Sequence, residues 1–295
     1  MQYKRLDYDK ELLKLLPKVL RARDFHLYLE NGKRLTDLWL SGGNVLLGHK
    51  PPRVLGELKN AAERGLFSPF PHPQEGRFFK ALKELFPDRG IRLYSAEASM
   101  YQALEEMGVS APENRRFIDP AFPEFDNNQV KGKAGEKSVK LWRPFFETPE
   151  EAQFLIPILP WPLGPKVLLI EKTLDFSFPA GEIIPPVLLA PVTRALNNLI
   201  AVMKAKIPNR GSPRYPKIEK ALNETKSESY FWRRRGIYLS VSQDIGMDRY
   251  RKLFLHFLEK GFFIPPSPEE PVILPGFMSN GEQAKLANLL LLQSY

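Results

Sequence analysis

Proline sets the tightest limit on how this chain can fold. The sequence contains 28 prolines among 295 residues, nearly twice the usual share of about 5%. Fifteen of them gather in four clusters, at residues 69–73, 157–165, 185–191 and 265–275. Because proline lacks an amide donor and has a restricted φ angle, such clusters are typical of loops and of the ends of helices and strands. The chain is therefore expected to fold as a series of short elements.

The most apolar stretch, residues 154–170, contains four of these prolines: Pro157, Pro160, Pro162 and Pro165. A membrane-spanning helix needs about 20 apolar residues with a continuous hydrogen-bond ladder, which prolines at this spacing interrupt. The first residues of the chain mix both charges and lack the apolar core of a signal peptide. These features predict a soluble, cytoplasmic protein without a membrane partner.

The composition excludes several kinds of site. Cysteine is absent, so neither a disulfide framework nor a thiolate nucleophile nor a cysteine-based metal site is available. Four histidines are too far apart in the sequence for a local metal-ligand motif. No metal site is therefore predicted. Hydrophobic residues make up 43% of the chain and charged residues 26%, as is ordinary for a globular protein of one or two domains.

Apolar patterns predict an alternation of helices and strands. A hairpin is expected at 26–35, because Asn31-Gly32 supplies the positive φ angles of a two-residue turn. Strands are expected at 91–95, 167–170, 237–241, 262–264 and 272–274, and helices at 52–65, 74–85, 97–107, 186–206, 248–259 and 280–292. This alternation favours an α/β or mixed α+β architecture.

Two stretches resemble one known family. They are Gly42-Gly43-Asn44-Val45-Leu46-Leu47-Gly48-His49 and Gly261-Phe262-Phe263-Ile264-Pro265-Pro266-Ser267. Both resemble the glutamate-1-semialdehyde aminomutase branch of the class III aminotransferases, which use pyridoxal phosphate. The resemblance implies an α/β fold with a shortened fold-type I large domain over residues 51–204. A smaller α+β domain would be built from both chain ends, residues 1–50 and 205–295.

The resemblance also implies a cofactor-binding segment. Tyr94-Ser95-Ala96-Glu97-Ala98 is similar to the family's Ser-Gly-Thr-Glu-Ala, where a strand leads into a helix whose first amides bind the cofactor phosphate. Ser95, Ala96 and Glu97 are thus implied as cofactor-binding residues. Ala96 replaces the Gly-Thr pair, which removes a hydroxyl donor and a glycine that allows close approach. The simpler interpretation of Ser95 and Glu97 is that they cap the helix.

A carboxylate and a lysine complete the family's site. The segment 167–172 resembles the strand whose final acid pairs with the pyridinium nitrogen, and Glu171 stands at that position. Glu171 could equally be an exposed or ion-paired carboxylate. The segment that should carry the Schiff-base lysine is deleted, since Pro185 follows soon after Glu171, and Lys172 is only a weak candidate. The family's ring-stacking Tyr-His-Gly tripeptide is absent.

These departures support three hypotheses. In the first, the chain has lost pyridoxal-phosphate catalysis and serves as a ligand-binding or regulatory subunit. It would bind an anionic small molecule, or form a homodimer or a heterodimer with a full-length paralogue. In the second, it is an active pyridoxal-phosphate-dependent aminotransferase or aminomutase with displaced catalytic residues.

The third hypothesis depends on charge. The chain carries a net charge of +9, and residues 203–260 contain 14 lysines and arginines against 6 acidic residues. Within them, Trp232-Arg233-Arg234-Arg235 places an aromatic side chain next to cations, as nucleic-acid-binding surfaces can. No nucleic-acid-binding module accompanies this run. A solvated basic face, or a surface for an acidic partner, is therefore favoured over nucleic-acid binding.

Overall fold

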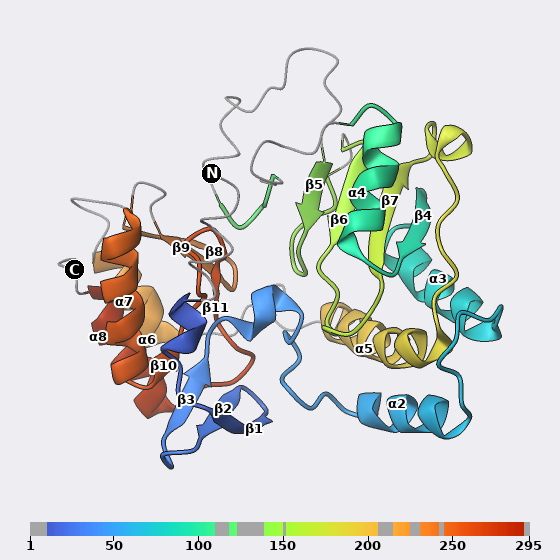
Figure 1. Cartoon of the computed structure of the whole chain (residues 1–295). Coiled ribbons are helices and arrows are strands. Elements are labelled where there is room, and N and C mark those ends of the chain that lie inside the picture. Colours follow the sequence, from blue (N-terminus) through green and yellow to red (C-terminus); the bar gives the residue numbers. More distant parts are fainter. Residues whose placement is uncertain are drawn as a thin grey trace. The chain divides into compact units, whose positions relative to one another are not determined.

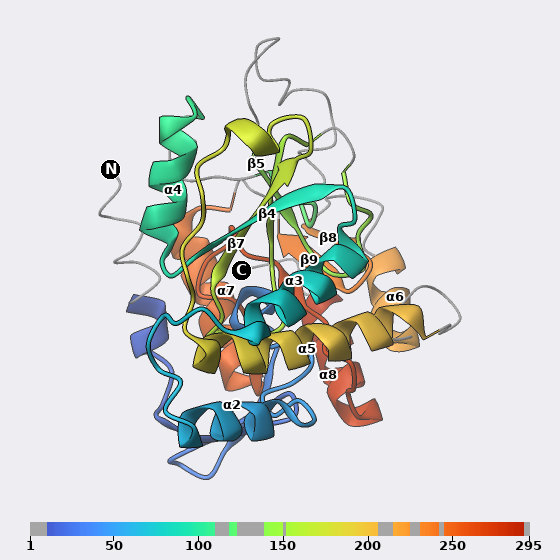
Figure 2. The same cartoon turned by 90° about the vertical axis from the view of Figure 1, so that its right-hand side faces the viewer.

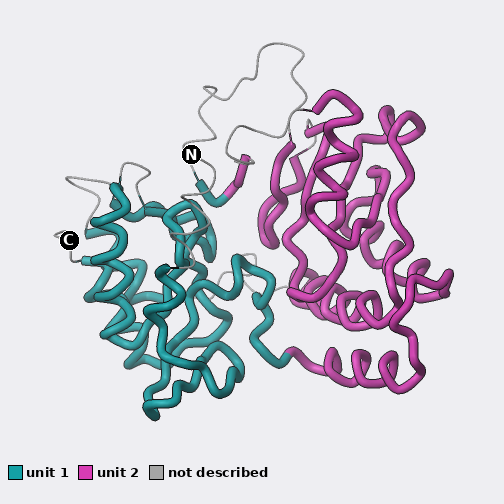
Figure 3. Tube along the Cα trace, in the orientation of Figure 1, with its two compact units in different colours: residues 1–50, 121–123, 211–295 teal, residues 51–120, 124–210 magenta. Residues whose placement is uncertain are grey.

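The computed structural model of the chain describes residues 11–109, 118–122, 139–149, 152–205, 215–224, 231–241 and 245–291. The chain divides into two compact units, shown in different colours in Figure 3. The terminal unit contains residues 1–50, 121–123 and 211–295, and the central unit contains residues 51–120 and 124–210. Each unit has its own sheets and core.

The terminal unit joins both ends of the chain in one sheet. Its strands are β1 (Val19–Arg23), β2 (His26–Leu29), β3 (Arg34–Asp37) and β10 (Phe262–Phe263), in the order β1-β2-β3-β10. β10 pairs in parallel with β3, and the other neighbours are antiparallel. The sheet thus links the two stretches on which the family resemblance was recognised, because the first follows β3 and the second contains β10.

The predicted hairpin forms as β2 and β3, but its turn differs from the prediction. The strands are joined by residues 30–33, with the Leu29 N–H donating to the Lys33 carbonyl at 2.9 Å. Gly32 has a φ angle of 76°, as expected for this position. The Asn31 side chain accepts a hydrogen bond from the Lys33 N–H at 3.1 Å. This side-chain contact supports a longer connection than the two-residue turn that the sequence suggested.

The terminal unit also contains a second sheet and a group of helices. The strands β8 (Trp232–Arg235), β9 (Tyr238–Val241) and β11 (Val272–Ile273) pair antiparallel in the order β11-β9-β8. The helices are α6 (Pro216–Glu224), α7 (Met247–Glu259) and α8 (Asn280–Leu291), and a 3-10 turn, η1, covers Leu40–Gly43. α6 packs against α8, and α7 packs against β10. The rings of Phe254 and Phe263 meet edge-to-face in the core between α7 and β10.

The central unit is built on a mixed sheet. Its strands are β4 (Arg89–Tyr94), β5 (Val139–Trp142), β6 (Phe154–Pro157) and β7 (Lys166–Glu171), in the order β4-β7-β6-β5. β7 is antiparallel to both of its neighbours, and β5 is parallel to β6. β4, β5 and β6 therefore all run in one direction. The residues of β6 and β7 are almost entirely buried, which explains their continuous apolar character.

Helices lie on both faces of this sheet (Figures 1 and 2). The helices of the central unit are α2 (Val54–Glu63), α3 (Pro73–Leu85), α4 (Glu97–Glu106) and α5 (Pro186–Lys204), and a 3-10 turn, η4, covers Asp175–Ser177. Met100 and Leu104 of α4 share a core cluster with Tyr94, Leu168 and Ile170 of the sheet. α5 packs against α2 and α3. In Figure 2, α4 lies on one side of the sheet and α3 on the other.

Within the described part of the chain, α5 is the single helix long and apolar enough to cross a bilayer by length and composition. Its contacts with α2 and α3 account for that character, since most of its residues are buried in the central unit. Pro191 lies inside the helix. Near this proline, the Thr193 hydroxyl donates to the Leu189 carbonyl of the same helix at 2.6 Å. The hydroxyl also accepts from Nε2 of Gln74 in α3 at 3.0 Å, which connects α5 to α3.

Candidate functional site

One edge of the central sheet gathers the ends of several strands. β4, β5 and β6 all end there, and β7 begins there, because it runs in the opposite direction. Ile118 adds an isolated parallel bridge to Lys140 of β5. In open α/β sheets, ligands bind beyond the carboxyl ends of the strands. We therefore take this carboxyl edge as the candidate site.

A carboxylate of the chain itself occupies the start of α4 at this edge. Ser95 directly follows β4, and both its N–H and its hydroxyl donate to Oε2 of Glu182, the N–H at 2.8 Å. These two bonds, the hydroxyl first, lower the pKa of Glu182, and a hydrogen bond from the Ser99 side chain adds to the effect. The ionised carboxylate thus lies where a helix start favours an anion.

The backbone that carries Glu182 lies directly against β4. The Glu182 N–H donates to the Leu93 carbonyl at 2.7 Å. A Cβ atom added to Gly181 would stand 2.8 Å from both the backbone nitrogen and the backbone oxygen of Leu93. Glycine is therefore required at position 181 by the close approach of two backbones, and it determines where the carboxylate of the next residue is held.

Arg92 of β4 binds residues that precede Glu182 in the same segment. Its Nε donates to the Pro179 carbonyl and its Nη2 to the Asp175 carbonyl, both at 2.8 Å. Its Nη1 also lies 2.8 Å from Oδ1 of Asp175. Charge-assisted bonds of this kind are stronger than neutral ones. We call residues 172–185 the strap, since contacts from Arg92 and Leu93 of β4 hold this segment along the strand.

A lysine lies close to the same helix start. Lys166 begins β7 and pairs with Tyr94 across the ladder, so it belongs to the carboxyl edge. Its Nζ is 2.9 Å from Oε1 of Glu97, and the two side chains are 41% and 52% exposed. A pair this exposed contributes about 1 kcal/mol or less. The amine is thus weakly held and accessible to solvent.

A buried ion pair stands at the same edge beyond β5. Arg143 follows Trp142 at the end of β5, and Asp119 follows the bridge residue Ile118. Nε and Nη2 of Arg143 donate to the two carboxylate oxygens of Asp119, each at 2.7 Å. Both residues are buried. Because each charge compensates the other, this pair stabilises the ends of neighbouring strands.

The sequence-predicted site residues separate into two groups. Ser95, Ala96 and Glu97 lie together at the carboxyl edge. Glu171 and Lys172 lie at the opposite edge, because the antiparallel register pairs Glu171 with Arg89. At about 3.4 Å per residue, the length of β7 separates the two groups by about 17 Å. The structure therefore does not bring Glu171 or Lys172 to the start of α4. They would lie there only if β7 ran parallel to β4, so that the carboxyl ends of both strands met at one edge.

The helix start also departs from simple capping. Ala96 is the residue that precedes α4, with extended backbone angles and no side-chain cap hydrogen bond. The Ser95 hydroxyl bonds to Glu182, and Glu97 pairs with Lys166. The interpretation of Ser95 and Glu97 as caps thus does not describe their contacts. At position 171, the carboxylate accepts a hydrogen bond from the neighbouring Thr173 hydroxyl at 2.9 Å.

The residues at this helix start do not fit a phosphate group as they are arranged. Both donors of Ser95 are directed at a carboxylate oxygen, and a phosphate placed there would meet the negative charge of Glu182 at close range. Ala96 offers no hydroxyl in place of the missing donor. Among the residues that the structure describes, no group of three or more histidine or acidic side chains could hold a metal ion.

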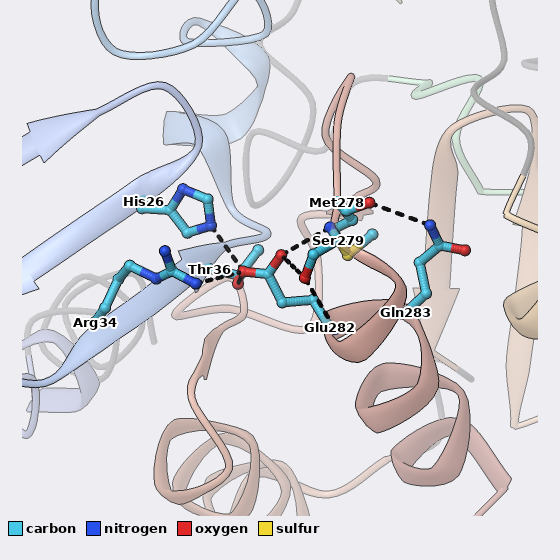
Figure 4. A network of polar contacts seen from close by, with 7 residues as sticks. All are labelled: His26, Arg34, Thr36, Met278, Ser279, Glu282 and Gln283. Carbon is cyan, nitrogen blue, oxygen red and sulfur yellow. Dashed lines mark hydrogen bonds and ion pairs between the residues drawn. The ribbon is translucent and has the colours of Figure 1, made fainter.

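A separate polar cluster lies in the terminal unit (Figure 4). Oε1 of Glu282 accepts hydrogen bonds from His26 Nε2 at 2.8 Å and from the Thr36 hydroxyl at 3.0 Å, and Arg34 Nη2 lies 3.4 Å away. Its Oε2 accepts from the N–H of Ser279 at 2.8 Å and from the Ser279 hydroxyl at 2.6 Å. The cluster connects the start of α8 to β2 and β3.

Glu282 is strongly stabilised as an anion. Its side chain is only 13% exposed. Burial alone would raise the pKa of this carboxyl, but hydrogen bonds from Ser279, His26 and Thr36 outweigh burial and lower the pKa to about 2. The Ser279 hydroxyl also accepts from the Glu282 N–H at 3.3 Å, which completes a reciprocal capping box. The cluster is therefore a structural connection whose acceptor is already saturated with donors.

Comparison with known sequences gives distant relatives. No family model matches the chain. An uncharacterized protein of Treponema pallidum (strain Nichols) is 24% identical over 304 residues, which cover 91% of this chain and 92% of the relative. A glutamate-1-semialdehyde 2,1-aminomutase of Thermus thermophilus is 32% identical over 71 residues, or 24% of this chain and 17% of that enzyme.

Solved structures decide the fold. An ornithine aminotransferase from Plasmodium yoelii has a TM-score of 0.58 at 15% identity, covering 97% of each chain. A transaminase with PLP bound has a TM-score of 0.62 at 12% identity, covering 99% of this chain and 97% of the transaminase. The chain has the fold of the class III aminotransferases. The predicted fold class is confirmed, and at these identities the likeness concerns the fold alone.

Three residues near this carboxyl edge were not identified from the sequence. Arg92 contacts the strap and Glu182 belongs to it, and no local spacing in the sequence signals a contact over 87 residues, such as that between Ser95 and Glu182. Lys166 was missed because β7 was interpreted through its last residues rather than its first. The run of prolines before Lys166 could have drawn attention to it, since it places this lysine at the beginning of a strand.

Proposed function

We propose that this chain is an aminotransferase-like protein that has lost pyridoxal-phosphate catalysis and acts as a ligand-binding or regulatory subunit. One observation carries the proposal: the Ser95 donors at the start of α4 bind Glu182 of the same chain. A helix start satisfied by an internal carboxylate has no need of an external phosphate. The separation of Glu171 and Lys172 from this helix start supports the same conclusion.

The chemistry of transamination explains why this arrangement should be inactive. An amine must act as a nucleophile, and a positioned base must move protons. Lys172 lies at the opposite edge from Ser95, and the exposed Lys166 forms an ion pair with Glu97. The retained fold would then serve in binding rather than in group transfer.

The test is covalent attachment of the cofactor. The purified full chain is incubated with pyridoxal phosphate, reduced with borohydride, digested and analysed by mass spectrometry. We expect scattered low-level labelling of exposed lysines and no absorbance band of bound cofactor. Stoichiometric labelling of a single lysine would overturn the proposal. The same chain unfolded in urea and treated in the same way gives the level of non-specific labelling.

The second candidate, an active enzyme with displaced catalytic residues, is favoured by the position of Lys166. This lysine shares the carboxyl edge with Ser95 and is accessible. If this candidate were correct, borohydride would fix pyridoxal phosphate to Lys166, and Lys166→Ala would abolish the labelling. The same labelling experiment therefore separates the two candidates.

Partners of the chain follow from the family resemblance. We propose a homodimer, or a heterodimer with a full-length aminotransferase, in the cytoplasm. Light scattering of the purified chain, alone and mixed with such an aminotransferase, distinguishes these states. A nucleic-acid role for the basic run on β8 is disfavoured, since Arg234 is turned toward Glu219 and the Gly236 carbonyl. Binding to nucleic acid that falls steeply with added salt would reverse this view.

A further inference from the structure

We propose that the outer edge of β1 (Val19–Arg23) binds an extended acidic segment of a partner protein, which adds to the sheet as a further strand. The proposal goes beyond the function proposed above, because it concerns the terminal unit and holds whether or not catalysis has been lost. When a strand edge binds a peptide, backbone hydrogen bonds supply affinity and alternate side chains supply specificity.

β1 is an exposed edge strand. In the order β1-β2-β3-β10 it pairs with β2 on one side, and no described strand pairs with its other side (Figure 1). Alternate N–H and C=O groups of such a strand point away from the sheet. Four of its five residues are exposed, including Val19 at 40% and Leu20 at 72%. The outer edge of β1 is therefore accessible to a second strand.

Two arginines of β1 lie on one face of the sheet. Arg21 pairs with Tyr28 across the ladder, and its guanidinium carbon lies 4.2 Å from the centre of the Tyr28 ring. Arg23 pairs with His26, on the same face. Nε of Arg23 lies 3.6 Å from Oδ2 of Asp24, and these side chains are 67% and 70% exposed. Because so exposed an ion pair is weak, both arginines are accessible to an anionic partner.

The opposite face of this edge is apolar. Val19 pairs with the buried Leu29. Ala22 pairs with the buried Leu27. The register shifts between Val19 and Arg21. A strand added beside β1 would direct alternate side chains toward the arginines and the remaining ones toward the apolar face. A segment in which acidic and apolar residues alternate therefore fits both faces of the edge.

Charge decides which kind of strand this edge accepts. Residues 18–34 contain five lysines and arginines and two acidic residues. A second copy of β1 paired antiparallel and centred on Arg21 would place two arginines opposite each other, and like charges opposite each other destabilise a sheet. Positive charges on edge strands commonly prevent such self-pairing. They attract an acidic strand, so the occupant is a partner protein rather than a second copy.

The test uses the full chain and a peptide of about six residues, a usual strand length, in which glutamate and valine alternate. Fluorescence anisotropy measures binding, and NMR measures hydrogen exchange of the β1 amides. We expect saturable binding, with exchange of the outward-pointing β1 amides slowed at least tenfold. A peptide with lysine in place of glutamate should bind at least tenfold more weakly. No saturable binding of the glutamate peptide, or equal binding of the lysine peptide, would overturn the proposal.

A backbone control separates strand addition from attraction between charges. Methylating alternate peptide nitrogens removes hydrogen-bond donors but keeps every side chain of the glutamate peptide. The methylated peptide should bind at least tenfold more weakly. Equal affinity would overturn strand addition. Equally tight binding of a single-stranded oligonucleotide of the same charge would also overturn it, because such a chain has no peptide groups to pair with β1.

Matched variants of the protein locate the binding edge. Arg21→Glu inverts a charge on β1, and Arg251→Glu makes the same change at an exposed position of α7. Affinity for the glutamate peptide should fall at least tenfold in Arg21→Glu and stay unchanged in Arg251→Glu. If Arg21→Glu fails to fold, Arg23→Glu takes its place. Equal affinities in the β1 variant and Arg251→Glu would show that the peptide binds elsewhere.

Sedimentation tests whether a second copy occupies this edge. Dissociation of a wild-type dimer by saturating glutamate peptide would assign the β1 edge to the dimer and overturn its assignment to a partner protein. An unchanged sedimentation coefficient of the dimer or monomer, apart from the mass of the peptide, supports the proposal. Attachment of pyridoxal phosphate to one lysine would overturn the loss of catalysis without affecting these results, so the two proposals can fail independently.

Discussion

Two glutamates of this chain accept the same pair of hydrogen bonds in different surroundings. Glu282 takes the N–H and hydroxyl of Ser279, three residues earlier in the sequence. Glu182 takes the N–H and hydroxyl of Ser95, 87 residues away. Both serines are exposed, but Glu282 has further donors from β2 and β3 and its side chain is only 13% exposed. The same serine–glutamate hydrogen bonds therefore connect α8 to β2 and β3 in the terminal unit, but lie at an exposed helix start in the central unit.

The difference teaches how to distinguish a buried structural anion from one at an exposed position. Replacing Glu282 leaves several buried donors without an acceptor, and such donors are costly. Replacing Glu182 leaves donors that water can reach. Stability should therefore depend strongly on Glu282 and weakly on Glu182. The predictions below are ordered by expected effect and test this contrast.

The largest effect is expected for Glu282→Ala. Loss of the acceptor of His26 and Thr36 should lower the free energy of unfolding by about 3 kcal/mol, since hydrogen bonds to a charged group are worth about 1.5–3 kcal/mol each. Urea denaturation measures this. Glu182→Ala should cost less than about 1 kcal/mol, and the exposed Glu224→Ala provides the baseline. A similar decrease in the free energy of unfolding for Glu282→Ala and Glu182→Ala would show that the two glutamates do not differ in structural importance.

Acid should weaken the chain through Glu282. Its pKa is lowered in the folded state from 4.5 to about 2, so its contribution is present above pH 4.5 and is lost as the pH falls toward 2. This loss should reach about 3 kcal/mol. Other carboxylates also titrate in this range, so the quantity to measure is the difference between wild type and Glu282→Gln in urea denaturation at several pH values. A difference that does not shrink below pH 4 would contradict the assignment.

The same contrast explains what could be predicted from sequence. The Ser279-x-x-Glu282 spacing is a local signal that sequence alone can reveal, although the donors from β2 and β3 are not visible in it. The predicted ranges match α3, β7 and α5 closely, whereas β5, β6 and β8 were not predicted. The family resemblance predicted the fold, and its two stretches follow β3 and contain β10, which pair in one sheet.

The candidate site was harder to predict, for a physical reason. A strand's sequence does not reveal its direction in the sheet, and the antiparallel register of β7 placed Glu171 beside Arg89 rather than beside Ser95. Contacts of the strap with β4 depend on two backbones meeting at Gly181. Neither feature produces a periodic pattern. Sequence therefore identified the helix start correctly but assigned it the wrong companions.

A smaller effect is expected for the serine partners. Ser279→Ala should lower the free energy of unfolding by about 1 kcal/mol, the usual cost of losing an N-cap side chain. Ser95→Ala should change it by less than half of that, because Ala96 and not Ser95 is the residue directly before α4, whereas the Ser279 hydroxyl accepts from the N–H of Glu282 in α8. Urea denaturation of both variants under identical conditions gives the ratio. A larger loss for Ser95→Ala would mean that the strap supports the fold of the central unit.

The smallest global effect, and the sharpest local one, is expected for Arg92→Lys. Lysine keeps the charge but has no planar fork, so it cannot bond to Asp175 and Pro179 together. The strap should loosen, and exchange of the Glu182 amide should accelerate while the free energy of unfolding changes by less than about 1 kcal/mol. Arg34→Lys is the matched control, because Arg34 is 53% exposed and only 3.4 Å from a glutamate that has other donors. It should leave exchange of the Glu282 amide unchanged. Since the capping box holds Glu282 locally and Arg92 holds Glu182 only through the strap, equal responses in the two variants would show that the two glutamates are anchored in the same way.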